Sequence, residues 1–171
     1  MARFVSISDF STGELKIATS TFQEADLQKF IDKVEPSILN ELLGCALYLL
    51  FIADWDAVTA NSFSQDRFKD IYKEFCKDDS CGICKSEGIK KMIMYFVYFE
   101  YLRFQNTQNR ITGQSKPKKE LSESVSTVHH ALFSEYNAGI ETYRAIQWHM
   151  CENSEDYIEE NGQRKEKASW L

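Results

Sequence analysis

The segment LSESVSTVHHALFSEYNAGIETYRAIQWHM, residues 121–150, carries the clearest pattern in the chain. Its apolar side chains recur at steps of three and four residues: Leu121, Val125, Val128, Leu132, Tyr136, Ile140, Tyr143, Ile146 and Met150. Such steps average the 3.6-residue period of an α-helix, so a single apolar stripe follows one face. The pattern predicts one long helix from about Lys119 to Glu152.

A helix of this length is long for a chain of 171 residues. At 1.5 Å per residue it would span roughly 50 Å. A compact globule of this chain length is only about 40 Å across. The helix is therefore expected to bend at Gly139 or to project, and a projecting stripe would need another subunit to cover it. The alternative, a stripe covered entirely by the chain's own bundle, stays open.

The residues before this segment predict further helices. Thr21 and Glu24 have the spacing of a capping box, which predicts a short helix to about Glu35. Pro36 suits the first turn of a second helix, because its missing N–H costs nothing there. That second helix is expected to run to about Trp55. Since it is apolar nearly all round, we expect it to be the central core helix.

Two more helices complete the predicted bundle. Residues 68–75 predict a short third helix, and a largely buried fourth helix is expected from Ser86 to about Gln105. The predicted fold class is mainly α, a bundle of about five helices with a long C-terminal helix, an extended N-terminal arm and a C-terminal tail.

The predicted organisation is a single helical domain with two appendages. Residues 1–20 are expected to form an N-terminal arm or small hairpin, residues 21–153 the helical bundle, and residues 154–171 a polar tail. Within the bundle, residues 107–119 lack acidic side chains and are rich in loop-forming residues, which predicts an exposed basic loop. Its cations are Arg110, Lys116, Lys118 and Lys119. They are expected either to contact phosphates or to be solvated.

Composition narrows the classes of function. A hydrophobic content of 43% and an aromatic content of 13% exclude a disordered chain, and two prolines leave few breaks in regular structure. A net charge of −6 is the wrong sign for a general nucleic-acid binder. The apolar stretches 38–53 and 92–99 are short for a membrane span, and the N-terminus has no pattern of a secretion signal.

Three of the five cysteines raise the question of a metal site. Cys76, Cys81 and Cys84 have the C-x4-C-x2-C spacing of the first three ligands in plant-type two-iron ferredoxins. The fourth ligand would have to be Cys45 or Cys151, before the run or far after it, and the surrounding pattern is helical. Zinc is an alternative, as are cysteines partly buried between helices. No metal or cofactor is assigned.

The sequence contains no recognisable catalytic motif. A di-iron bundle would need Glu three residues before His, and the residues in that position are Ser126, Thr127 and Ile146. Nucleophile elbows, phosphate-binding glycine loops, zinc-protease helices and dinucleotide fingerprints are also missing from the sequence. We therefore expect a protein that is not an enzyme.

Three segments carry a resemblance: LFIADWD at 50–56, SEGIKKMIMYFVYFEY at 86–101 and YNAGIETYRAIQWHMCEN at 136–153. Together they resemble the small helical head-to-tail connector proteins of tailed Bacteroidetes phages, including crAss-like phages. The stretches ISDF, DLQKFID, ITG and SWL fit the same family, so the likeness spans nearly the whole chain. These are packing residues, and none is a catalytic signature.

The resemblance implies a structural virion protein in the neck of the particle, assembled in the host cytoplasm. Its copies, commonly twelve, would form a ring that docks on the portal, contacts adjacent tail or ring proteins and extends the channel for genomic DNA. The expected interface residues are Arg110, Lys116, Lys118, Lys119, Tyr136, Tyr143, Trp148, Trp170 and Leu171. The alternatives are a cytoplasmic helical adaptor or regulatory protein, and a small metal-binding protein built on the cysteines.

Overall fold

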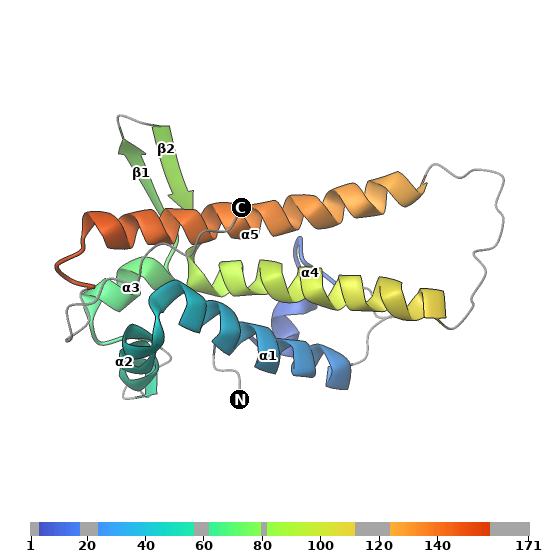
Figure 1. Cartoon of the computed structure of the whole chain (residues 1–171), viewed down its shortest axis with the longest axis horizontal. Helices are drawn as coiled ribbons and strands as arrows, with labels where there is room; N and C mark the ends of the chain where they lie inside the picture. Colours follow the sequence, from blue (N-terminus) through green and yellow to red (C-terminus); the bar gives the residue numbers. More distant parts are fainter. Residues whose placement is uncertain (1–3, 18–23, 57–61, 80–81, 112–123, 158–171) are drawn as a thin grey trace. The chain divides into compact units, whose positions relative to one another are not determined.

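The computed structural model describes residues 4–17, 24–56, 62–79, 82–111 and 124–157 (Figure 1). Within these residues the chain is mainly helical, which confirms the predicted fold class. The chain divides into two compact units, which are described separately. Unit 1 comprises residues 1–35 and 91–140, and unit 2 comprises residues 36–90 and 141–171.

The N-terminal segment belongs to unit 1 and corrects the expectation of an extended arm or hairpin. Its described residues contain a 3-10 helix, η1 (Ile7–Phe10), capped where the backbone N–H of Ser6 donates to Asp9 over 2.8 Å. The N–H of Ile17 returns to the carbonyl of Phe10 over 3.0 Å. Because polar side chains satisfy the backbone locally, a tight turn replaces the strand, and Phe10 and Ile17 are buried.

The side chain of Glu35, on the helix that follows, holds the first described residues of this segment in place by hydrogen bonds. One carboxylate oxygen, Oε2, accepts hydrogen bonds from the backbone N–H groups of Phe4 and Val5, each 3.1 Å long. Glu35 is only 3% exposed, and both partners are buried as well. A buried carboxylate is tolerated where hydrogen bonds compensate its desolvation, as here.

The first helix, α1 (Glu24–Leu43), continues through Pro36, so the predicted helix boundary there was wrong. The break comes at Gly44, which has a φ of +78°, and α2 (Cys45–Asp56) begins directly after it. Proline removes one hydrogen bond from a helix, whereas a left-handed φ ends the helix and is readily adopted by glycine. The chain therefore bends at Gly44 (Figure 1).

The core of unit 1 contains residues from α4 (Gly88–Ile111) and α5 (Ser124–Glu152). The ring of Tyr136 on α5 lies 4.5 Å from Phe99 and 5.6 Å from Phe96, between ring centroids. A Cβ added to Gly139 would lie 3.0 Å from the Cβ of Tyr95. Gly139 therefore allows α5 to approach α4 closely, and α5 stays helical on both sides of it.

The core of unit 2 is an aromatic cluster between α2 and α3 (Asp66–Tyr72). The ring of Phe63, in the loop between them, is central, with centroid distances of 4.5 Å to Phe51 and 4.9 Å to Trp55. Phe68 and Tyr72 on α3 complete the cluster at 5.9 and 5.2 Å from Phe63. Trp55 thus anchors the end of α2.

An antiparallel hairpin follows α3 and was not predicted (Figure 1). Strand β1 (Phe75–Asp79) pairs with β2 (Gly82–Ser86) in a register that sets Phe75 opposite Ser86. The predicted third helix therefore ends at Tyr72, before Phe75. Gly88, with a φ of +84°, starts α4, and a Cβ there would collide with the carbonyl oxygen of Tyr72.

The fourth helix is longer than expected. α4 extends to Ile111, so residues 107–111 are helical and the basic loop does not begin at residue 107. No proline follows until Pro117, and the next glycine is Gly113, so no helix breaker stands in this stretch. No single helix among the described residues is long and apolar enough to cross a membrane. Only α1 and α2 taken together, bent at Gly44, pass that test of length and composition.

Candidate functional site

One face of α2 is exposed and apolar, and we call it the α2 surface. It comprises the exposed residues Cys45, Leu49, Leu50 and Ala53. Leu49 is 61% exposed and Leu50 is 42% exposed. No Asp, Glu, Lys or Arg occurs between residues 45 and 53. The expected central core helix is therefore buried on one face only, and its other face is uncharged and open.

The opposite face of α2 packs in the core of unit 2. Leu47 and Phe51 are buried, and the ring of Phe51 packs edge-on to Phe68 at 5.3 Å. Leu47 and Phe51 are one helical turn apart, as are Cys45 and Leu49 on the exposed face. The aromatic cluster thus fixes the buried face and turns the α2 surface outward.

Asp54, near the end of α2, caps the start of α3. Its carboxylate accepts hydrogen bonds from the backbone N–H of Ser64, over 2.9 Å, and that of Gln65, over 3.2 Å. Both side chains donate to it as well. Burial acts to raise the pKa of Asp54, but the hydrogen bonds from Ser64 and Gln65 outweigh it and lower the pKa below 3.8. The charged carboxylate therefore joins the two helices.

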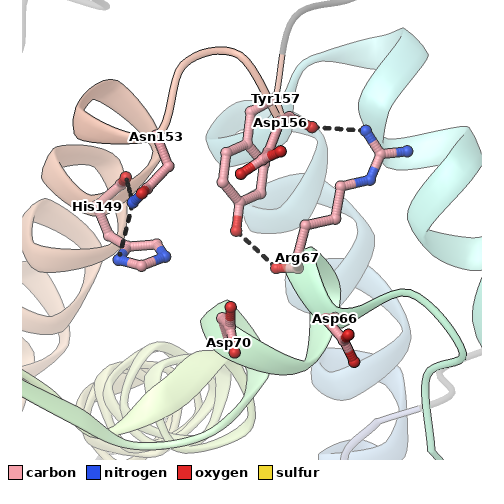
Figure 2. Close-up of a pocket in the computed structure, with 7 residues that line it drawn as sticks. All are labelled: Asp66, Arg67, Asp70, His149, Asn153, Asp156 and Tyr157. Carbon is pink, nitrogen blue, oxygen red and sulfur yellow. Dashed lines mark hydrogen bonds between the residues drawn. The ribbon is translucent and has the colours of Figure 1, made fainter.

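A cavity of about 310 Å³ lies in unit 2, between α3 and the end of α5. Figure 2 shows the side chains that line it, which are Asp66, Arg67, Asp70, His149, Asn153, Asp156 and Tyr157. Three of these are carboxylates. The lining contains no serine, threonine or cysteine that could act as a nucleophile.

Hydrogen bonds across this cavity fasten the chain after α5 to α3. The hydroxyl of Tyr157 donates to the carbonyl oxygen of Arg67 over 2.6 Å, and Nη1 of Arg67 donates to the carbonyl oxygen of Asp156 over 2.6 Å (Figure 2). Burial, together with the nearby charges of Asp70 and Asp156, raises the pKa of Tyr157. Tyr157 therefore keeps its proton, and the two hydrogen bonds together hold the residues after α5 against α3.

His149 forms the wall of the cavity on the side of α5. Its ring is 4.9 Å from that of Phe75 on β1 and 6.2 Å from that of Tyr157, between centroids. The side-chain amide of Asn153 donates to the carbonyl oxygen of His149 over 2.8 Å (Figure 2). His149 is only 7% exposed. These contacts give it a packing role that holds α5, the hairpin and the final turn together.

A second exposed apolar feature lies in unit 1, and we call it the Phe133 surface. Phe133 on α5 is 55% exposed, and its ring lies 6.2 Å from that of Phe99. The guanidinium of Arg103 lies 5.9 Å from the Phe99 ring and pairs with Glu100 over 2.8 Å. Phe99 and Phe133 thus form an aromatic area that lies beside the ion pair of Arg103 and Glu100.

The structure places the predicted interface residues in different environments. Tyr136 is half-buried between Phe96 and Phe99, and Trp148 is also half-buried. Tyr143 is 8% exposed, so it belongs to the core and offers no free surface. Arg110 is in α4, not in a loop. Lys116, Lys118, Lys119, Trp170 and Leu171 lie outside the described residues.

The cysteines lie on different elements. The register sets Cys76 opposite Lys85 and Cys84 opposite Lys77, so these two cysteines are not cross-strand partners. Cys45 and Cys151 are exposed on α2 and α5, Cys76 is exposed on β1, and Cys81 is outside the described residues. Among the described residues, no three His, Cys, Asp or Glu side chains are grouped to hold a metal ion.

The sequence analysis missed the α2 surface, the Phe133 surface and the docking of Tyr157 on α3, and a signal in the sequence was available only for Tyr157. A lone aromatic in an otherwise polar stretch, Tyr157, often marks a docked segment. For α2 the sequence offered no such signal, because a helix that is apolar all round does not reveal which face is covered.

Comparison with known proteins found no relative. No protein-family model matches the chain, and neither does any curated protein or any solved structure. The resemblance to connector proteins therefore depends on the quoted segments alone.

Proposed function

We propose that this chain is a structural virion protein, a subunit of an oligomeric head-to-tail connector ring that docks on a phage portal and extends the DNA channel. The observation that carries the proposal is the α2 surface, where Leu49 and Leu50 are 61% and 42% exposed on an uncharged stretch of helix. Contiguous exposed apolar surface marks a site of contact with another macromolecule. The resemblance to connector proteins indicates the kind of assembly, a ring on the portal, in which this contact would be made.

The free energy of covering this surface supports a role in assembly. Burying a leucine side chain fully stabilises a protein by about 1.5–3 kcal/mol. The exposed parts of Leu49 and Leu50 together amount to about one leucine, so covering them would contribute about 1.5–3 kcal/mol in each copy. A ring of many copies recovers this amount once per subunit. The contribution is modest for one contact and large for the assembled particle.

The charge balance is compatible with a channel for DNA. A net charge of −6 repels phosphates on average, so DNA would pass such a wall without being held by it. The cations of residues 110–119 are the local exception in the sequence. In this proposal they face the portal, the DNA or the next ring.

The proposal is tested by assembling the purified full-length chain with the portal protein of the phage that encodes it. We expect a complex whose native mass corresponds to a ring of copies on one portal, visible by electron microscopy as an added layer. A chain that binds a partner one-to-one and forms no ring would favour the adaptor function. A chain encoded outside any phage genome, or one that ignores portal complexes, would refute the connector function.

A further inference from the structure

The sequence after Tyr157 contains a short apolar segment, Ala168-Ser169-Trp170-Leu171, which we call the ASWL segment. It lies outside the described residues. The stretch before it, EENGQRKEK at 159–167, has no hydrophobic side chain. Trp170 and Leu171 are therefore large apolar side chains in a polar stretch, and covering such side chains is favourable.

The α2 surface is the matching apolar surface in the same unit. Unit 2 contains both α2 and residues 141–171. Among the described residues of unit 2, the large exposed hydrophobic side chains are Leu49 and Leu50. Both belong to the α2 surface, so the ASWL segment has one such surface to meet among the described residues of its own unit.

The charges of the two partners are complementary. From Val34 to Asp66 the sequence contains no lysine or arginine, and all its charged side chains are acidic. One of them, Glu41, is exposed on α1 shortly before α2 begins. Directly before the ASWL segment, residues 164–167 are Arg-Lys-Glu-Lys, with three cations and one acid. Docking on α2 would therefore bring a basic stretch towards an acidic one, which favours this pairing.

The chain is long enough to make the contact. Tyr157 is held on α3 by its hydrogen bond to Arg67, and the neighbouring Phe68 packs on Phe51 of α2 with ring centroids 5.3 Å apart. The α2 surface lies on the other side of that helix, which is about 10–12 Å wide. Residues 158–169 can span about 40 Å when fully extended. They can therefore pass around α2 and bring Trp170 to its exposed face.

Attachment favours the segment of the same copy over that of another. The exposed parts of Leu49 and Leu50 together amount to about one leucine side chain. A contact of this size holds a free peptide only weakly. A segment attached to the same chain is present at an effective concentration in the millimolar range, far above that of other copies in a micromolar solution.

We infer that the ASWL segment covers the α2 surface of its own copy before assembly, with Trp170 and Leu171 against Leu49 and Leu50. The role of this contact in assembly rests on the proposed function. In the proposed ring, the portal or a neighbouring copy displaces the segment and takes its place. The apolar face of α2 is then hidden until a partner is present, which protects the free chain from aggregation.

The reactivity of Cys45 measures whether the surface is covered, because this native thiol is exposed on the α2 surface. The other four cysteines are changed to serine in the full-length chain, and the thiol is titrated with a disulfide reagent at micromolar protein. We expect the combined change Trp170→Ser and Leu171→Ser to raise the rate at least about threefold. Gln163→Ser is the control and should leave the rate unchanged.

Circular dichroism of the same chains separates uncovering from unfolding. We expect equal helix content in all of them, because the changed positions 163, 170 and 171 lie outside the described helices. Equal Cys45 rates with and without Trp170 and Leu171 would overturn the inference. A faster rate accompanied by loss of helix would overturn it as well, since the segment would then stabilise the fold without covering the surface.

Disulfide formation tests whether the segment belongs to the same copy. Ser169→Cys is added to the chain that retains Cys45, and oxidation is followed at micromolar protein. The matched control replaces Cys45 with serine and carries Glu74→Cys, an exposed position just after α3. We expect a bond within one chain that forms at least about fivefold faster with Cys45 than with the control. Equal rates, or bonds found only between chains, would overturn the inference.

Failure of this inference and failure of the proposed function give different results. A chain whose Cys45 reacts equally with and without Trp170 and Leu171, yet forms rings on the portal, would refute the covering and leave the connector function standing. A chain whose Cys45 is protected but which never binds the portal would refute the connector function and leave the covering standing.

Discussion

Replacing Glu35 on α1 with alanine is expected to destabilise the protein strongly. The substitution removes the acceptor of two buried backbone N–H groups, those of Phe4 and Val5, each 3.1 Å from Oε2. Hydrogen bonds to a charged group stabilise a fold by about 1.5–3 kcal/mol each. Losing both, and leaving two buried donors unsatisfied, should lower the free energy of unfolding by roughly 3–5 kcal/mol.

The glutamine variant separates the charge from the hydrogen bonds. Glu35→Gln keeps an oxygen that can accept from both N–H groups and loses only the assistance of the charge, so we expect a loss of about 1–2 kcal/mol. Glu41→Ala is the control, an exposed glutamate on the same helix, with an expected change within about 0.5 kcal/mol.

The assay is urea unfolding followed by circular dichroism at pH 7, with the free energy extrapolated to water. Hydrogen exchange of the Phe4 and Val5 amides gives a local reading of the same contact. If the free energies of unfolding of Glu35→Ala and the wild type differ by less than about 0.5 kcal/mol, the carboxylate makes no net contribution to stability and the reasoning from burial is refuted.

Three further predictions concern α3, α5 and the buried tyrosine. Asp54→Asn should weaken the start of α3 and make the stability of the protein less sensitive to acid. Because the pKa of Asp54 is lowered in the folded state, its stabilisation is present above about pH 4 and is lost as the pH falls further. Acid titration of the wild type and the variant would measure the difference. Tyr143 has a buried hydroxyl with no hydrogen-bond partner among the described residues, so Tyr143→Phe should leave stability unchanged or raise it by up to about 1 kcal/mol in urea unfolding. Burial, with the charge of Glu41, raises the pKa of Tyr143 to about 12. As the pH rises from 10 towards 12 the unfolded state therefore ionises first and the wild type loses stability, whereas Tyr143→Phe should not share that loss. Gly139→Ala should lower the free energy of unfolding, measured with urea, by about 1 kcal/mol, because the overlap of the added Cβ with Tyr95 outweighs the gain in helix propensity. A variant more stable than the wild type would contradict the close approach of α5 to α4.

The helices themselves were predictable from the sequence, but several of their ends were not. The stripe of α5 follows the helical period over seven turns, and that regularity identifies a helix without tertiary information. The predicted boundary at Pro36 failed because proline in a helix costs one hydrogen bond, which surrounding packing can offset. Gly44 ended the helix instead, through a φ that the sequence does not reveal.

The hairpin and the two surfaces depended on tertiary contacts. The strand Phe75–Asp79 has three polar residues among five, so no alternation of apolar and polar side chains marked it. α2 is apolar on all sides, and the choice of its covered face is made by Phe63 and Phe68, which pack against Phe51. Such a choice depends on residues more than ten positions away.

The direction in which α2 leaves α1 is set at a single glycine, and this has a practical consequence. Gly44 turns the chain, while the aromatic cluster and Asp54 fix the buried side of α2. The outward residues Cys45, Leu49, Leu50 and Ala53 take no part in either task. They can therefore be changed as a set, for instance to charged side chains, to alter what the helix binds while its attachment to the rest of unit 2 is kept.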